Sequence, residues 1–222
     1  MLGLFFWSDA SADETRDYHY ESRGGKVTIT AYIGSSITAI IPKTFDGLPV
    51  RRIGDRAFSG RIGVKSVRVP DGITSIGEQA FMNCNSLADI TIPDSVNSIG
   101  FEAFASCTRL TSLSIPNGVS TIGERTFMGC IRLAELKIPN SINSIKEQAF
   151  SGCRMLERIT IPHLVTKILK ETFLDCSSLT GITLSERTTS IGNRAFSGSG
   201  LESFTIPERV TQIGELAFSD CK

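Results

Sequence analysis

Residues 87–107 read LADITIPDSVNSIGFEAFASC, and residues 110–130 repeat the pattern as LTSLSIPNGVSTIGERTFMGC. The copies share Leu, Ile, Pro, Val, Ile, Gly, Phe and Cys at equivalent positions. The phenylalanine returns every 23 residues, with a last step of 22, at Phe58, Phe81, Phe104, Phe127, Phe150, Phe173, Phe196 and Phe218. A fixed period in this range predicts a repeat solenoid, in which each copy forms one coil and packs on its neighbours.

The segment between the leucine and the proline of each copy alternates in polarity, as from Leu87 to Pro93. This pattern predicts a strand with one buried face, which the proline ends because it lacks an N–H group. The following glycine column is predicted to adopt a turn conformation open to glycine. The next residues, Glu78 to Phe81 in one copy, are predicted to form one turn of α- or 3₁₀-helix, with an acidic residue at its positive end.

Stacked coils pair strand on strand at about 4.8 Å, so equivalent residues lie above one another. The phenylalanines then form a continuous apolar spine. The predicted fold is therefore a solenoid with a parallel β-sheet on one side and short strand or 3₁₀ segments on the other.

Departures from the repeat divide the chain into three predicted parts. Residues 1–17 contain a short apolar run and Ala10-Ser11-Ala12, so they are either the remnant of a signal peptide or a disordered terminus. Residues 18–53 are predicted to cap the core, with a hairpin strand at Lys26–Tyr32 and five extra residues at Phe45–Pro49. Residues 54–222 are predicted to form about seven to eight coils without an evident C-terminal cap. The open edge of the last coil favours self-association.

Composition argues against two classes of partner. Basic and acidic residues number 23 each, so no net charge attracts the chain to nucleic acid or anionic membranes. No apolar stretch approaches the ~20 residues of a membrane-spanning helix. The apolar fraction of 41% is enough to bury a continuous core.

The repeat columns, I-P-x-x-V-x-x-I-G-x-x-A-F-x-x-C with L-x-x-I between copies, closely resemble the BspA-like leucine-rich repeat. Val27–Gly34 and Asp46–Val50 resemble the opening unit of bacterial members, so the resemblance covers roughly residues 18 to 221. It implies a right-handed leucine-rich-repeat coil with a parallel sheet on its concave side and irregular segments on its convex side. Family members are mostly bacterial or protist surface and secreted proteins, some of them adhesins. The resemblance implies no catalytic residues.

The six cysteines could indicate disulfides in a secreted chain, but each follows a phenylalanine by three residues. Such a column predicts a ladder of buried free thiols acting as small apolar residues. The spacing does not suit zinc, which takes closely spaced cysteine pairs. His19 and His163 are isolated and are predicted to be surface residues. Because no nucleophile elbow or phosphate loop is present, we expect neither an enzyme nor a cofactor.

The outward residues of the L-x-x-I-x-I strands form the candidate binding surface. Most are small or carry hydroxyl groups, and the charged residues of interest are a cluster at Glu135, Lys137, Glu157 and Arg158 and a basic corner at Lys65 and Arg68. One interpretation is a polar surface that binds a protein or a glycan. The alternative is a solvated sheet in which Ser and Thr supply β-propensity and solubility. Of the residue types that dominate protein interfaces, the face offers only Arg68 and Arg158.

Three functions therefore remain open. The first is a non-enzymatic binding protein that is secreted or on the cell surface and acts in adhesion, as the resemblance and the Ala10-x-Ala12 pattern suggest. The second is an intracellular, cytoplasmic interaction scaffold, because unpaired thiols suit a reducing compartment. The third is a structural spacer within a longer surface protein.

Overall fold

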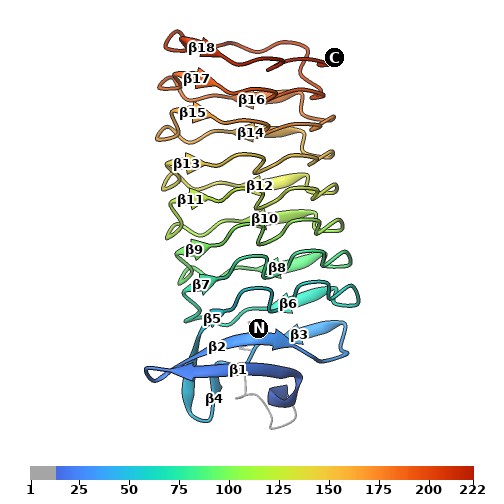
Figure 1. Cartoon of the computed structure of the whole chain (residues 1–222), viewed down its shortest axis with the longest axis vertical. Coiled ribbons are helices and arrows are strands. Elements are labelled where there is room, and N and C mark those ends of the chain that lie inside the picture. Colours follow the sequence, from blue (N-terminus) through green and yellow to red (C-terminus); the bar gives the residue numbers. More distant parts are fainter. Residues whose placement is uncertain (1–13) are drawn as a thin grey trace, which may run out of the picture.

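Two parallel ladders of short strands run along a stack of coils in the computed structural model, which describes residues 14–222 (Figure 1). The coils follow one another in sequence order from one end of the stack to the other (Figure 1). The predicted repeat solenoid is therefore confirmed, and equivalent residues of neighbouring coils pair directly, as Leu113 does with Leu136 and Ile122 with Ile145.

The first ladder consists of β3 (Thr38–Ile40) and the predicted L-x-x-I-x-I strands, each three residues long, except that the strand predicted at 201–206 does not form. The predicted strands that form are β6 (Ser66–Arg68), β8 (Asp89–Thr91), β10 (Ser112–Ser114), β12 (Glu135–Lys137), β14 (Arg158–Thr160) and β16 (Gly181–Thr183). Backbone pairing is interrupted along this ladder: it joins β3, β6 and β8, then β10 to β12, then β14 to β16.

The second ladder precedes the glycine column. It contains β5 (Leu48–Ile53), β7 (Ser75–Ile76), β9 (Ser98–Ile99), β11 (Thr121–Ile122), β13 (Ser144–Ile145), β15 (Lys167–Ile168), β17 (Ser190–Ile191) and β18 (Gln212–Ile213). Because the two ladders lie on different sides of each coil, they enclose a single core between them (Figure 1).

The N-terminal segment begins with a 3₁₀ turn, η1 (Glu14–Asp17), and a hairpin of β1 (Tyr18–Arg23) and β2 (Lys26–Tyr32). The strand predicted at Lys26–Tyr32 is therefore present, and it pairs with β5 to continue the second ladder. The extra residues form a second hairpin, in which β4 (Thr44–Phe45) pairs with β5. The capping role remains a prediction, and the predicted cleavage pattern lies outside the described residues.

The phenylalanine column forms the predicted spine. The rings from Phe58 to Phe196 are fully buried, and successive centroids from Phe58 to Phe218 lie 5.0 to 5.7 Å apart with planes 3° to 24° from parallel. Tyr32 stacks on Phe58 at 5.2 Å and covers the N-terminal end of the spine. The core is thus a column that each coil extends by one ring.

The helical turn predicted after the glycine column is not observed. The second residue of that segment has a left-handed backbone instead, with φ of 53° at Gln79, 51° at Glu102 and 53° at Arg125. A right-handed helix cannot contain this conformation. The acidic residues therefore do not lie at the N-terminus of a helix. One of them, Asp55, accepts a hydrogen bond from the backbone N–H of Glu78 in the next coil.

The glycine column is also explained differently from the prediction. Gly77 and Gly100 do not have a left-handed φ. A Cβ at Gly77 would lie 2.6 Å from the backbone nitrogen of Asp55, and a Cβ at Gly100 would lie 2.6 Å from that of Glu78. Glycine is needed there because neighbouring backbones approach closely.

Candidate binding surface

Most outward residues of the first ladder are exposed, as the alternation predicts. In β10, for example, Ser112 and Ser114 are exposed while Leu113 between them is buried. All six candidate residues on this face, Lys65, Arg68, Glu135, Lys137, Glu157 and Arg158, are exposed. Their exposure follows from the period of a strand with one buried face.

The structure does not bring these six residues into one cluster. Arg68 lies on β6, which is separated from β12 by β8 and β10. Glu135 and Arg158 lie in consecutive coils, but β12 and β14 are not hydrogen-bonded to each other. Among residues 14–222, no ion pair joins the four charged residues of the predicted cluster. Their role in binding remains a prediction.

A shallow depression of about 250 Å³ lies on this face, across three of its strands. Its polar lining comes from three successive strands, and its apolar part from Ile90, Ile92 and Leu113; the polar residues are Asp89, Thr91, Ser112, Ser114, Glu135 and Lys137. Lys137 also lines a second depression of about 190 Å³ beside Asp94 and Asn117. Lys137 is thus shared by two hollows.

Glu157 and Arg158 lie outside both depressions. Arg158 extends over Gly181 of the next coil, where a Cβ would lie 3.0 Å from its Nη1 atom. The missing side chain at Gly181 lets the guanidinium group lie close to the sheet. Arg158 is therefore held on the strand surface, apart from the hollow beside Lys137.

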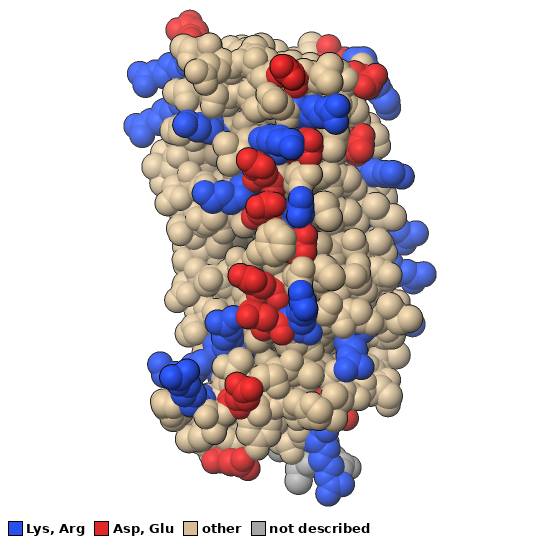
Figure 2. Space-filling model, in the orientation of Figure 1, with Lys and Arg blue, Asp and Glu red and all other residues tan. Residues whose placement is uncertain are grey.

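A polar ladder that sequence reasoning missed runs through the left-handed turn residues. Arg56 Nε donates to Gln79 Oε1, and Gln79 Nε2 donates to Glu102 Oε2, at 2.6 Å each. The same order begins again at Arg125, which pairs with Glu102 and donates to Gln148, whose amide donates to Glu171. The sequence signal was the order Arg-Gln-Glu at one repeat position. Figure 2 shows acidic and basic side chains gathered along the length of one face of the molecule.

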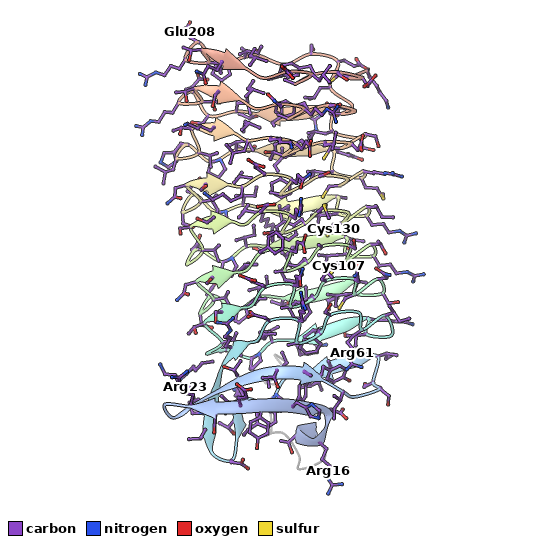
Figure 3. All side chains as sticks on the ribbon, in the orientation of Figure 1. Arg16, Arg23, Arg61, Cys107, Cys130 and Glu208 are labelled. Carbon is purple, nitrogen blue, oxygen red and sulfur yellow. The ribbon has the colours of Figure 1, made fainter. Side chains whose placement is uncertain are left out.

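The cysteine column consists of free thiols, as predicted. Cys107 and Cys130 lie in adjacent coils (Figure 3), and each Sγ donates a hydrogen bond to the carbonyl of the phenylalanine in the preceding coil. Burial raises the pKa of the Cys130 and Cys176 thiols to about 12. A protonated, buried thiol is a poor nucleophile, so these side chains stabilise coil-to-coil contacts.

Three further observations concern the histidines, the possible metal ligands and the helices of the described chain. His19 and His163 are exposed, as predicted. Among residues 14–222, no group of His, Cys, Asp and Glu side chains is arranged to hold a metal ion. In the same part of the chain, no helix has the length and apolar character needed to cross a lipid bilayer.

Comparison with known proteins is consistent with this geometry. The sequence matches the BspA type Leucine rich repeat region in 6 copies, over residues 30–120 and 98–222. The chain belongs to the BspA-type leucine-rich repeat family. Among curated proteins, none matches the sequence.

Three solved structures extend the comparison. A leucine-rich repeat protein from T. pallidum shares 27% identity and a TM-score of 0.83, over 96% of this chain and 100% of its own. One from Bacteroides ovatus shares 25% identity with a TM-score of 0.71, over 97% of this chain and 62% of its own. A leucine rich cell surface protein from Faecalibacterium prausnitzii shares 36% identity with a TM-score of 0.65, over 92% of this chain and 51% of its own. This BspA-type chain therefore spans only part of the latter two proteins.

Proposed function

We propose that this BspA-type chain is a non-enzymatic binding protein that recognises a protein or a glycan through the face of its first ladder. The observation that carries the proposal is the depression across β8, β10 and β12, where charged and hydroxyl side chains surround an apolar patch. Such a mixture of an apolar floor and a few polar groups is typical of binding sites. The side chains stand on strands, which makes their positions rigid.

The binding role is tested with substitutions inside the hollow. Ser114→Arg should fill it and Lys137→Glu should reverse its charge, and neither side chain contributes to the core because both are exposed. Lys146→Glu makes the same charge change at an exposed position in the glycine column. We expect wild type and Lys146→Glu to bind the same members of a panel of immobilised matrix proteins and glycans. Equal binding by Ser114→Arg and Lys137→Glu would remove this face from the proposal.

We further propose that the protein is secreted or displayed on a cell surface and acts in adhesion. The 36% identical relative described as a cell surface protein supports this location. The thiols do not favour a reducing compartment, because burial and the hydrogen bonds to phenylalanine carbonyls account for their free state. Protease added to intact source cells should degrade the protein, or the medium should contain it. Complete protection inside intact cells would contradict this location and favour an intracellular scaffold.

We also propose that the protein self-associates through the coil that contains β18. Ile206, Ile213 and Leu216 are 42%, 51% and 55% exposed, and Phe204 lines a depression there with Phe218. Apolar surface of this kind favours contact with another surface. We expect a concentration-dependent increase in mass by analytical ultracentrifugation, and a monomer at all concentrations would contradict it.

A further inference from the structure

A second surface lies on the turns that connect the cysteine column to the leucine column. Each C-x-x-L turn places two residues between two buried ones. In three consecutive coils these pairs are Thr108-Arg109, Ile131-Arg132 and Arg154-Met155, and all but the half-buried Thr108 are exposed. We call these six residues the arginine ridge. It adjoins the first ladder but contains none of the residues that line the depression beside Lys137.

The ridge is held in place by the core. Cys130 and Leu133 on either side of the central turn are fully buried, and the backbone N–H of Leu133 donates to the carbonyl of Cys130 at 3.0 Å. The same hydrogen bond closes the turns of Leu110 and Leu156. Phenylalanine rings of these coils are 5.7 Å apart, which sets the spacing of successive turns. Arg109 and Arg132 share one repeat position, and Arg154 occupies the position next to it, which is that of Ile131. The backbone of the ridge therefore needs no rearrangement when a partner binds.

The ridge arginines lack partners within the protein. In the described part of the chain, the guanidinium groups of Arg109, Arg132 and Arg154 form no ion pair or hydrogen bond. Basic side chains project from the right-hand edge of Figure 2, the side on which Cys107 and Cys130 are labelled in Figure 3. Like charges at this spacing repel one another, and an acidic partner would relieve that repulsion.

The fold does not require these side chains. The equivalent turns of the flanking coils contain Asn85-Ser86 and Ser177-Ser178, which satisfy the same backbone geometry with small polar residues. Beside the arginines, Ile131 and Met155 expose 39% and 50% of their surface. Arginine and methionine are enriched in protein interfaces, whereas an apolar pair gives little to a purely anionic polymer.

We propose that the arginine ridge docks a segment of another protein that carries both acidic and apolar side chains. The carboxylates pair with Arg109, Arg132 and Arg154, because the guanidinium group matches a carboxylate in two parallel hydrogen bonds. The apolar side chains contact Ile131 and Met155. This site is separate from the hollow beside Lys137, so it does not depend on the function proposed for that face.

The test uses the whole protein and a fluorescein-labelled peptide of Glu-Glu-Leu repeats, with fluorescence polarisation as the measurement. Two comparison peptides separate the contributions: Glu-Glu-Ser repeats lack apolar groups, and Gln-Gln-Leu repeats lack charge. We expect wild type to bind the Glu-Glu-Leu peptide more tightly than either comparison peptide. Equal binding of the Glu-Glu-Ser peptide or of heparin would overturn the proposal in favour of a general polyanion site, and so would the absence of binding by wild type.

The variants use residues that the repeat already accepts. Replacing Arg109, Arg132 and Arg154 together by Ser, as in the flanking coil, should weaken peptide binding at least about tenfold, because three exposed ion pairs are lost. The matched control replaces Lys167, Arg187 and Arg209, exposed basic residues of consecutive coils outside the C-x-x-L turns, by Ser, and it should bind as wild type does. The double variant Ile131→Ser with Met155→Ser should also weaken binding. Unchanged binding in the ridge variants, with thermal melts like that of wild type, would overturn the proposal.

Discussion

The phenylalanine and cysteine columns show how one residue position stabilises this molecule. Phe127 is fully buried and stacks between Phe104 and Phe150 with ring centroids 5.7 Å away on both sides. Phe218 is only partly buried and stacks on one phenylalanine of the spine, Phe196. Phenylalanines at the same repeat position therefore contribute unequally to the free energy of unfolding, because each coil contacts only its neighbours.

Truncation of the spine should reveal this difference. Phe127→Ala should lower the free energy of unfolding by about 3–5 kcal/mol, because it leaves a cavity between two rings. Phe218→Ala should cost less, since its ring is partly exposed already. Urea unfolding followed by circular dichroism measures both values, and equal losses would contradict the stacked column.

The thiols make stability depend on alkaline pH. Because the pKa of Cys130 is raised to about 12, the native thiol keeps its proton where the thiol of the unfolded chain, with a pKa near the usual 9.0, has lost it. The stability that this thiol contributes is complete below the pKa of the unfolded state, and it is lost as the pH rises to the pKa of the folded state. When the pH rises from 8 to about 10.5, we expect the free energy of unfolding to fall by ~2 kcal/mol for each such thiol.

The substitution Cys130→Ser isolates one thiol. Serine does not ionise in this range, and Ser199, which is 1% exposed, already occupies the same column. Its urea unfolding at the two pH values should show a smaller loss of stability than wild type does. An identical loss of stability in both proteins would show that this thiol does not contribute to the pH dependence.

At the scale of one element, the left-handed turns place polar side chains in register with those of the next coil. Gln148 accepts from Arg125 Nε and donates to Glu171 Oε2, so its amide bridges three coils. Glu171 is 9% exposed, and a buried carboxylate needs such partners. The ladder therefore joins the turns in addition to the spine.

Gln148→Ala should lower the free energy of unfolding by about 1–3 kcal/mol, because two hydrogen bonds are lost and Glu171 keeps fewer partners. Gln and Ala carry the same penalty at a left-handed φ, so the difference reports the side chain. Glu147→Ala removes an adjacent exposed side chain and should change stability by less than ~0.5 kcal/mol. Chemical denaturation of the three proteins compares them, and similar values for both variants would contradict a stabilising ladder.

The whole molecule is a quasi-one-dimensional stack, and its stability is approximately a sum over coils and the contacts between them. Every coil repeats the same two strands, spine ring and turns. A change in coil number should therefore preserve the architecture, provided that the repeat stays in register.

Deletion of residues 110–132 removes one period and joins Arg109 directly to Leu133, which preserves the C-x-x-L turn. We expect a folded protein with a wild-type-like circular dichroism spectrum and a lower Tm, because one coil and its contacts are lost. Deletion of only residues 110–120 places strand residues over turn residues and should prevent cooperative folding. A folded product from both deletions would contradict the requirement for register.

The solenoid, its spine, the exposed strand face and the free thiols were all determined by the sequence alone. The physical reason is that a 23-residue period forces equivalent residues to stack, so one copy predicts the environment of every other. The β2 strand was predictable in the same way, from its alternation between Lys26 and Tyr32.

Only the tertiary structure decided the backbone conformation of the turns and the reason for their glycines. The predicted helical turn is a left-handed turn, and the glycines are required by the backbone of the adjacent coil, which a pattern within one copy does not reveal. The division of the sheet face into the hollow beside Lys137 and a separate Arg158 also depends on which strands pair. The arginine ridge also depended on the tertiary structure, because only stacking brings the turns of Arg109, Arg132 and Arg154 next to one another.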